Sequence, residues 1–193
     1  MTQAKLFEDE PRPAVERYSG GTGVSGHEGS GGKGLSDDWI TPRWIIDELG
    51  PFDLDPCESD FQPWPCAAAA HHKPEGLLLP WAGRVWCNPP YGQQLGDWLV
   101  RCAKHGDAIA LTFARTETKS FFRGVWGKAD AILFLRGRLR FHRPDGSAGD
   151  ASTGPSVLIA YGADNADRLK ALAPTHGAYL EIGRDRVPGR AVK

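Results

Sequence analysis

The sequence predicts an α/β fold with a mostly parallel β-sheet and antiparallel edge strands. From residue 37 onward, short apolar runs typical of buried strands alternate with segments of helical periodicity. The last apolar runs lie close together in the chain, which favours antiparallel pairing at one edge of the sheet. A length of 193 residues suits one such domain with tails, because it is too short for two full cores.

A glycine-rich segment precedes the predicted domain. Residues 19–34 contain eight glycines, and Val24 is their only sizeable apolar side chain. Such a segment cannot bury enough surface to offset the entropy lost on ordering it. A phosphate-binding loop is not predicted, because no strand precedes the glycines and no GKS or GKT follows them. We therefore predict a flexible tail at 1–35, a folded domain at 36–185 and a C-terminal tail at 186–193.

The first elements of the domain follow the tail closely. Thr41 and Pro42 precede RWIIDEL and a glycine, which predicts a short helix with Thr41 as N-cap and Pro42 at the first helical position. The run FDLDP predicts a strand that ends at Asp55, because Pro56 cannot extend a β-ladder. Residues 57–80 are rich in Pro and Ala, and their pattern predicts no element.

The remainder of the domain alternates between strands and helices. Apolar runs predict strands at residues 84–87, 107–113, 129–135, 139–142, 156–161 and 178–182. Apolar residues at helical spacing predict helices at 93–105 and 163–172, and a further helix that Thr116 caps.

The net charge of the chain does not indicate a class of partner, but the charged residues are unevenly distributed along the sequence. The chain has 23 Lys and Arg against 24 Asp and Glu, for a net charge of −1. Residues 1–114 carry 9 basic and 16 acidic side chains, whereas residues 115–193 carry 14 and 8. A polyanion is therefore a plausible partner for the second part. No apolar run approaches the roughly 18 residues of a membrane span, and the acidic N-terminus does not resemble a signal peptide, so we expect no membrane partner and a cytoplasmic protein.

The four cysteines form no CxxC pair. Cys87 lies in an apolar run and Cys102 in a helical pattern, so both are predicted to be buried free thiols. Cys66, His71 and His72 lack the paired spacing of zinc ligands, and we predict no metal site.

Four residues that directly follow the strand at 84–87 carry the candidate chemistry: Asn88, Pro89, Pro90 and Tyr91. This tetrapeptide arises by chance in roughly one chain of this size per thousand. A rigid turn would account for the two prolines. It would not account for an asparagine at the end of the strand or an aromatic side chain after the prolines.

These residue types suit methylation of an exocyclic amine such as adenine N6, whose lone pair is delocalised into the ring. Two acceptors that hold its N–H bonds would favour a pyramidal nitrogen and direct the lone pair at an electrophile. The side-chain oxygen of Asn88 and the backbone carbonyl of Pro89 can be these acceptors. Tyr91 can stack on the base, which reaches such a pocket only after it flips out of the duplex.

The chain resembles the small phage-type DNA adenine-N6 methyltransferases, a Dam-like family that contains NPPY and uses S-adenosylmethionine. The resemblance covers about residues 37–162, through the ordered segments DDWITP, FDLDPC, EGLLLPW, GRVWCNPPYG, LTFART, GRLRF and PSVLIAYG. It implies a reduced Rossmann-like methyltransferase sheet. It also implies an adenine-specific methyltransferase of double-stranded DNA in the cytoplasm of a bacterium or a phage-infected host.

The resemblance further implies contacts to S-adenosylmethionine from three short segments. A TP segment lies against the cofactor, an acidic strand-end motif lies beside its methionine part and ribose, and an EGL segment stands where the family commonly has DGL, near its adenine. The matching positions are Thr41 and Pro42, then Asp55, Pro56 and Cys57, then Glu75. DPCESD contains no glycine, unlike the turn of larger relatives, and residues 57–75 are too few for a strand-helix-strand unit, so an abbreviated cofactor pocket is expected.

A basic cluster follows NPPY in the sequence. Residues 115–143 hold eight basic side chains against two acidic ones. Arg136, Arg138 and Arg140 alternate, and a period of two would place them on one face of a strand as a track for DNA phosphates. Together with Arg115, these are the predicted DNA contacts.

Other interpretations stay open. Cytosine N4, RNA and a glutamine side chain offer similar amines, although Asn rather than Ser at position 88 favours adenine. A DNA-binding phage protein that lacks catalysis is an alternative of a different class, and the intact NPPY argues against it. Little chain remains for a separate recognition unit, so a short or relaxed target sequence is expected. The sequence predicts no oligomeric state.

Overall fold

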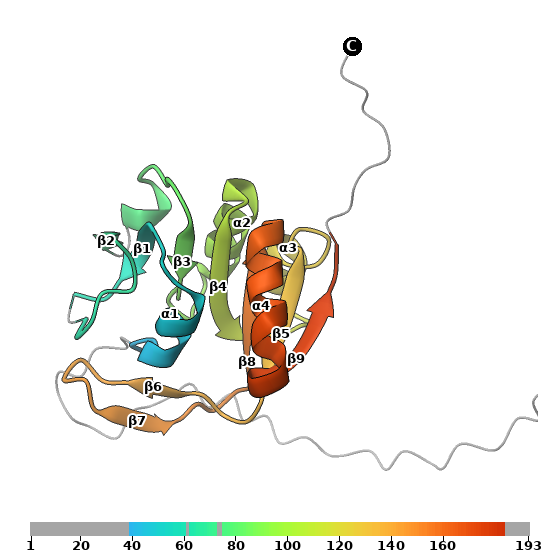
Figure 1. Ribbon diagram of the computed structural model, residues 1–193. Coiled ribbons are helices and arrows are strands. Elements are labelled where there is room, and N and C mark those ends of the chain that lie inside the picture. The colour runs from blue at the N-terminus through green and yellow to red at the C-terminus, as the bar shows by residue number, and fades with distance from the viewer. Residues whose placement is uncertain (1–38, 61, 73–74, 184–193) are drawn as a thin grey trace, which may run out of the picture. The chain divides into compact units, whose positions relative to one another are not determined.

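Figure 1 shows the computed structural model of the protein, which describes residues 39–60, 62–72 and 75–183. The tails predicted at 1–35 and 186–193 lie outside these ranges. Within them, no helix is long and apolar enough to cross a lipid bilayer.

Seven strands of the described chain form the main sheet, in the order β2-β1-β3-β4-β8-β5-β9. Their bounds are β1 Leu54–Glu58, β2 Ala69–His72, β3 Val85–Cys87, β4 Ala108–Phe113, β5 Ala131–Leu135, β8 Ser156–Tyr161 and β9 Gly177–Glu181. Strands β2, β1, β3 and β4 run parallel to one another, whereas β8 is antiparallel to β4 and β5, and β9 is antiparallel to β5. This arrangement confirms the predicted α/β class, with β9 as an antiparallel edge strand.

Strand β8 adds an antiparallel strand inside the sheet. It pairs with β4 along its whole length, from Ala108 opposite Tyr161 to Phe113 opposite Ser156. All six of its residues are buried. Burial on both faces requires a continuous apolar run rather than alternation, and the VLIAY run of this strand meets that requirement.

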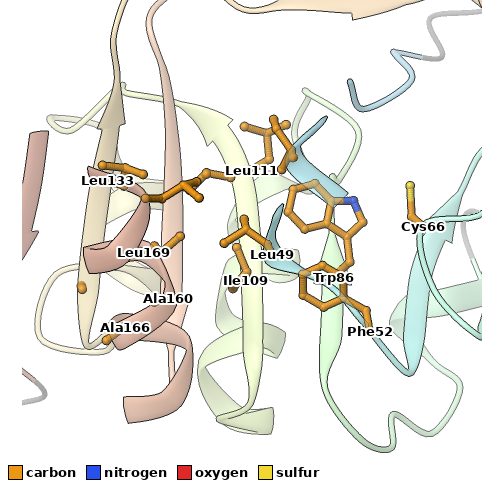
Figure 2. Close-up of a cluster of buried hydrophobic side chains, with 14 of the residues drawn as sticks. Leu49, Phe52, Cys66, Trp86, Ile109, Leu111, Leu133, Ala160, Ala166 and Leu169 are labelled. Carbon is orange, nitrogen blue, oxygen red and sulfur yellow. The ribbon is translucent and has the colours of Figure 1, made fainter. Parts of the chain in front are cut away.

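Helices cover both faces of the sheet. Their bounds are α1 Arg43–Leu49, α2 Leu95–His105, α3 Lys119–Gly124 and α4 Ala163–His176, with a short 3-10 helix η1 at Glu75–Leu77. Leu49 of α1 and Leu169 of α4 pack with Ile109 and Leu111 on one face (Figure 2). Helices α2 and α3 pack on the other face, where Ala110 lies. The alternation along β4 thus supplies two hydrophobic cores.

A hairpin outside the main sheet connects β5 to β8. It consists of β6 Arg140–His142 and β7 Ala148–Ala151, which pair antiparallel. Figure 1 shows it beyond the end of the sheet toward which β4 points. Ile40 forms an isolated antiparallel bridge to His142, with N–H···O distances of 3.1 and 2.9 Å. The start of the domain is thereby attached to a hairpin from its second half.

The predicted end of the first strand at Asp55 is wrong, because β1 continues through Pro56 to Glu58. The pairing of β1 with β2 is regular at Asp55 and shifts in register before Glu58. Proline lacks an N–H group, but at such an irregularity it interrupts no regular ladder.

Two predicted helix caps are also wrong by one or two residues. Helix α1 begins at Arg43 with Pro42 at the N-cap, so Thr41 precedes the cap. Helix α3 is capped by Thr118, whose Oγ1 accepts the N–H of Phe121 at 3.4 Å, rather than by Thr116. The sequence analysis also missed β2 and β7, whose sequences AAHH and AGDA lack the β-branched and aromatic residues typical of strands.

Candidate active site

The order of the strands places a ligand site at one position on the sheet. The chain runs from β1 outward to β2 and then returns past β1 to β3, so the direction of the connections reverses between β1 and β3. In open α/β sheets, ligands bind at the carboxyl ends of the strands at such a switch point. Asp55 lies on β1, and Asn88 directly follows β3. The fold therefore brings these two predicted site residues to neighbouring strands.

Asn88 is held by a backbone carbonyl from the start of the domain. Its side-chain Nδ2 donates a hydrogen bond to the Trp39 carbonyl oxygen at 2.8 Å. Its Oδ1 is buried and accepts no hydrogen bond from the residues that the structure describes. A buried acceptor without a donor costs free energy, so such an atom in a native fold calls for a ligand or another explanation. An incoming N–H group would satisfy it.

Tyr91 packs among aromatic rings beside this asparagine. Its ring stacks on Phe113 with centroids 4.6 Å apart and an interplanar angle of 7°, and it meets the edge of Phe141 at 6.3 Å. Burial, with smaller contributions from the neighbouring Cys57 and Cys87 thiols, raises the pKa of the Tyr91 hydroxyl above its usual range. Because Phe113 occupies one face of the ring, a base could stack only on the opposite face.

Further unpaired polar atoms gather at the same end of the sheet. Among the described residues, the Tyr91 hydroxyl, Thr112 Oγ1 and Ser156 Oγ are buried and have no hydrogen-bond partner. Thr112 lies near the end of β4, and Ser156 begins the antiparallel strand β8 opposite Phe113. With Asn88 Oδ1, they leave acceptors at the carboxyl edge of β3 and β4 to which a polar ligand can bond, although Arg84 Nη2 and the indole nitrogens of Trp86 and Trp98 are also unpaired in the described chain.

Asp55 presents a carboxylate at the neighbouring strand. The side chain is buried, and its Oδ1 accepts the backbone N–H of Cys57 at 3.0 Å. Burial raises the pKa of the Cys66 thiol, and the nearby carboxylates of Asp55 and Glu58 raise it further. Burial likewise raises the pKa of Cys87, whose Sγ lies 3.9 Å from that of Cys57. The thiols whose pKa is raised stay protonated and are poor nucleophiles.

The other predicted cofactor contacts lie around β1. Thr41 is buried, and its carbonyl accepts the indole N–H of Trp64 at 3.2 Å. Glu75 is exposed and begins η1. Gly76 fits tightly against β1, because a Cβ there would overlap the carbonyl oxygen of Pro56. The glycine of the EGL segment is thus required to seat η1 on β1, and the described residues between β1 and β2 contain no helix.

These residues suit S-adenosylmethionine. A buried carboxylate can accept hydrogen bonds from the ribose hydroxyls or the amino group of the methionine part. Asn88 Oδ1, Thr112 Oγ1 and Ser156 Oγ are unpaired acceptors within the described chain at the adjoining edge. These polar atoms are therefore compatible with this cofactor bound beside an amine substrate.

The predicted arginine track is wrong in its geometry. Arg136 and Arg138 lie in the connection before β6, and only Arg140 belongs to the strand. Gly137 between them adopts a left-handed conformation with φ of 77°, which breaks the extended backbone that alternation requires. All three side chains are nevertheless exposed. Arg115 is exposed and lies over the Phe113 ring at 5.8 Å, next to Tyr91.

Two cavities of the described chain lie away from this site. One of about 630 Å³ is lined by Gly106, Asp130, Gly162 and residues of α4 and β9, at the amino end of β5. A second of about 220 Å³ lies beside Trp81 at the end of α2. Neither contains a predicted site residue, so the candidate site rests on the switch point and the unpaired polar atoms rather than on cavity size.

The sequence analysis missed Trp39. It quoted this residue only as part of DDWITP, and its carbonyl, rather than its ring, contacts Asn88. A backbone carbonyl leaves no signal in residue type, so only the fold reveals this contact.

One of three comparisons with known proteins finds a match for this chain. The family model described as DNA N-6-adenine-methyltransferase (Dam) matches residues 30–168. Neither the curated proteins nor the solved structures contain a significant match. The matched segment spans most of the sheet, including β1, the NPPY loop and β8. This chain therefore belongs to the DNA N-6-adenine-methyltransferase (Dam) family.

Proposed function

We propose that this protein transfers a methyl group from S-adenosylmethionine to N6 of adenine in double-stranded DNA. The observation that carries the proposal is Asn88 Oδ1, which is buried at the switch point and has no donor among the described residues. An amine N–H is the group that this oxygen would accept. The cofactor supplies an activated methyl group on its sulfonium sulfur.

The chain's own residues orient the amine for a direct attack. Asn88 Oδ1 and the Pro89 carbonyl accept the two N–H bonds of the target amine and favour a pyramidal nitrogen. Pro89 is buried and Pro90 limits the backbone, so the carbonyl needs little rearrangement during the reaction. The nitrogen lone pair forms the new N–C bond while the S–C bond breaks and its electrons return to sulfur. The methylated nitrogen then loses a proton to water.

The target base must leave the duplex to reach this site. N6 of a paired adenine is enclosed in the duplex and bonded to its partner base, so it cannot reach the buried Asn88 Oδ1 until the base is extruded. Tyr91 offers the face of its ring that is opposite Phe113. The exposed Arg115 and Arg140 can hold phosphates on either side of the extruded nucleotide. Asp55 orients the cofactor from β1.

One experiment tests the reaction and its substrate. The protein is incubated with methyl-labelled S-adenosylmethionine and double-stranded DNA, and the DNA is digested to nucleosides and separated by chromatography. We expect label in N6-methyl-2′-deoxyadenosine. Label in N4-methyl-2′-deoxycytidine would change the substrate, and parallel incubations with RNA and a glutamine peptide test the remaining amines. No labelled product with a protein that binds the cofactor would contradict the proposal.

A further inference from the structure

The side chain of Asn88 can act only in one of its two orientations. The carboxamide oxygen and nitrogen have nearly the same shape, but only the oxygen can accept an amine N–H. If the group were rotated by 180°, it would present hydrogens to the target amine and would not hold it. Something in the protein must therefore distinguish the two orientations.

The Trp39 carbonyl makes this distinction. A carbonyl oxygen accepts hydrogen bonds and cannot donate them, so the atom of Asn88 that lies 2.8 Å from it must be Nδ2. The opposite orientation would place two oxygens against each other. Oδ1 is consequently directed away from Trp39, into the position where it has no donor in the described chain.

Trp39 is itself held on several sides. The next residue, Ile40, is 1% exposed and forms both backbone hydrogen bonds of its bridge to His142. The Trp39 ring contacts Phe141 of the same hairpin strand, with centroids 6.0 Å apart. The carbonyl of Thr41 accepts the Trp64 indole N–H. The acceptor for Asn88 is thus preorganised by the β6–β7 hairpin rather than by the catalytic loop.

We propose that Trp39 is a positioning residue: its backbone carbonyl, fixed by the Ile40–His142 bridge, sets the orientation of the Asn88 carboxamide and makes the site selective for asparagine over aspartate at position 88. This inference rests on the proposed function for its catalytic consequence. Its structural content, the contact between Asn88 Nδ2 and the Trp39 carbonyl, can be tested without DNA or cofactor.

The first test is Asn88→Asp. An ionised carboxylate cannot donate to the Trp39 carbonyl, whereas a protonated one can, so the pKa of this carboxyl in the folded state is expected to rise above the value of about 3.9 in the unfolded chain. A raised folded-state pKa gives stability at low pH that is lost as pH rises. As the pH is raised, the folded-to-unfolded ratio of the variant should therefore fall relative to that of the original protein. The total fall should be about tenfold for each unit by which the folded-state pKa exceeds the unfolded one. The apolar control Asn88→Leu should show a pH-independent difference.

The neighbouring Cys87 and Tyr91 do not produce this difference, because their raised pKa values keep both neutral between pH 4 and 8. Repulsion from the Asp55 carboxylate would raise the pKa of a carboxyl at position 88 whether or not the Trp39 carbonyl accepts from it, so it does not depend on the ester of the second test. Burial of a carboxyl would also raise its pKa, and the second test separates this contribution.

The second test weakens the carbonyl itself. Replacement of Ile40 by its α-hydroxy acid analogue converts the peptide bond after Trp39 into an ester, whose carbonyl is a poorer acceptor. It also removes the Ile40 N–H that donates to the His142 carbonyl, so the control must weaken the same bridge. The matched control places the α-hydroxy analogue of threonine at Thr41. That ester weakens the Ile40 carbonyl, which accepts the His142 N–H, and leaves the Trp39 carbonyl an amide. Circular dichroism confirms that each variant folds.

We expect the ester after Trp39 to lower kcat about tenfold, with unchanged DNA KM and cofactor Kd. It should also reduce the pH-dependent penalty of Asn88→Asp, that is, the loss of stability that this variant shows as the pH rises. The control ester should leave that penalty intact. A penalty of the same size with and without the ester would overturn the positioning role, even if methyl transfer is normal. If the penalty depends on pH and on the ester but the original protein transfers no methyl group, the proposed function fails and the positioning contact stands.

In the methyl-transfer assay, Asn88→Asp should regain activity relative to the original protein as the pH is lowered from 8 to 5. The protonated carboxyl then donates to Trp39 and leaves its other oxygen for the amine. Equal ratios of activity at all pH values would contradict the selectivity for asparagine.

Discussion

At Asn88, the two ends of one carboxamide have different neighbours: a carbonyl oxygen on the nitrogen side and no donor from the described chain on the oxygen side. A side chain chosen only for packing would satisfy both ends, because a buried unpaired acceptor costs about 1–3 kcal/mol. Stability alone therefore does not explain an asparagine at this position. A group that accepts from a transient substrate does.

Replacement of Asn88 by Ala should lower kcat by about 10²–10³ because one positioned acceptor is lost. The affinity for S-adenosylmethionine, measured by calorimetric titration, should change little, since in the proposed function the cofactor is held mainly from β1. Methyl transfer near the original rate in this variant would show that the oxygen does not hold the amine.

Asp55→Asn preserves the shape of the buried side chain and removes its charge. We expect S-adenosylmethionine to bind more weakly, because an amide holds the ribose hydroxyls and the amino group less strongly than a carboxylate. DNA affinity in the absence of cofactor should stay the same. Thermal unfolding checks that the variant is folded. Equal losses of cofactor and DNA binding would assign Asp55 a purely structural role.

Tyr91 gives a prediction for alkaline pH. Its pKa in the folded protein is raised by burial, above the value of about 10 in an unfolded chain, so the unfolded state ionises first as pH rises. The free energy of unfolding should therefore fall above about pH 10. Tyr91→Phe should lose less stability in this range, as denaturant unfolding at pH 9 and 11 can show.

The same substitution separates the ring from the hydroxyl in catalysis. Tyr91→Phe should keep most activity, because the ring face that can stack on a base is retained. Tyr91→Ala should lose it, since stacking of a base on an aromatic ring contributes roughly 1–3 kcal/mol and the packing on Phe113 is also lost. Similar damage from both changes would point to the hydroxyl.

At the scale of elements, the β6–β7 hairpin carries Arg140 on the strand that also contains Phe141. Arg140 alternates with the buried Leu139 and Phe141, so its side chain is exposed while theirs are packed. Arg136 and Arg138 precede it in an irregular connection. The hairpin and its approach, rather than one strand face, form the predicted surface for DNA phosphates.

A triple change of Arg136, Arg138 and Arg140 to Gln should weaken binding to all DNA sequences. Each lost phosphate contact should flatten the slope of log K against log salt by about 0.9, for a total of up to about three units. Lys170→Gln, on α4 beside the cavity at the other end of the sheet, is the matched control and should leave the slope unchanged. An unchanged slope in the folded triple variant would remove this surface from the DNA interface.

The elements that the sequence predicted best are those whose side chains alone decide their structure. The strand at 156–161 is confirmed at both ends, because two-sided burial demands a continuous apolar run. Helix α2 is confirmed to within two residues and ends at Gly106, which has a left-handed φ of 84°. The strand that contains Pro56 was misjudged at its end, since the register shift that tolerates proline arises from pairing with β2.

At the scale of the whole molecule, the sequence predicted the residues of the candidate site but not what orients them. NPPY and Asp55 were visible as residue types near strand ends. The Trp39 carbonyl, the Ile40 bridge and the stacking of Tyr91 on Phe113 depend on how distant segments meet, and no local pattern encodes them. The alternation of arginines led to a wrong prediction for the same reason, because Gly137 bends the backbone between Arg136 and Arg138.

The bridge between Ile40 and His142 also governs when the site comes into existence during folding. It joins positions about a hundred residues apart, and closing so long a loop costs entropy that only the formed sheet can offset. The strands and helices between these positions can assemble before the bridge is made. Refolding should therefore bury the tryptophans of the core before it restores methyl transfer. A chain that has not yet formed the Ile40–His142 bridge would be compact but inactive.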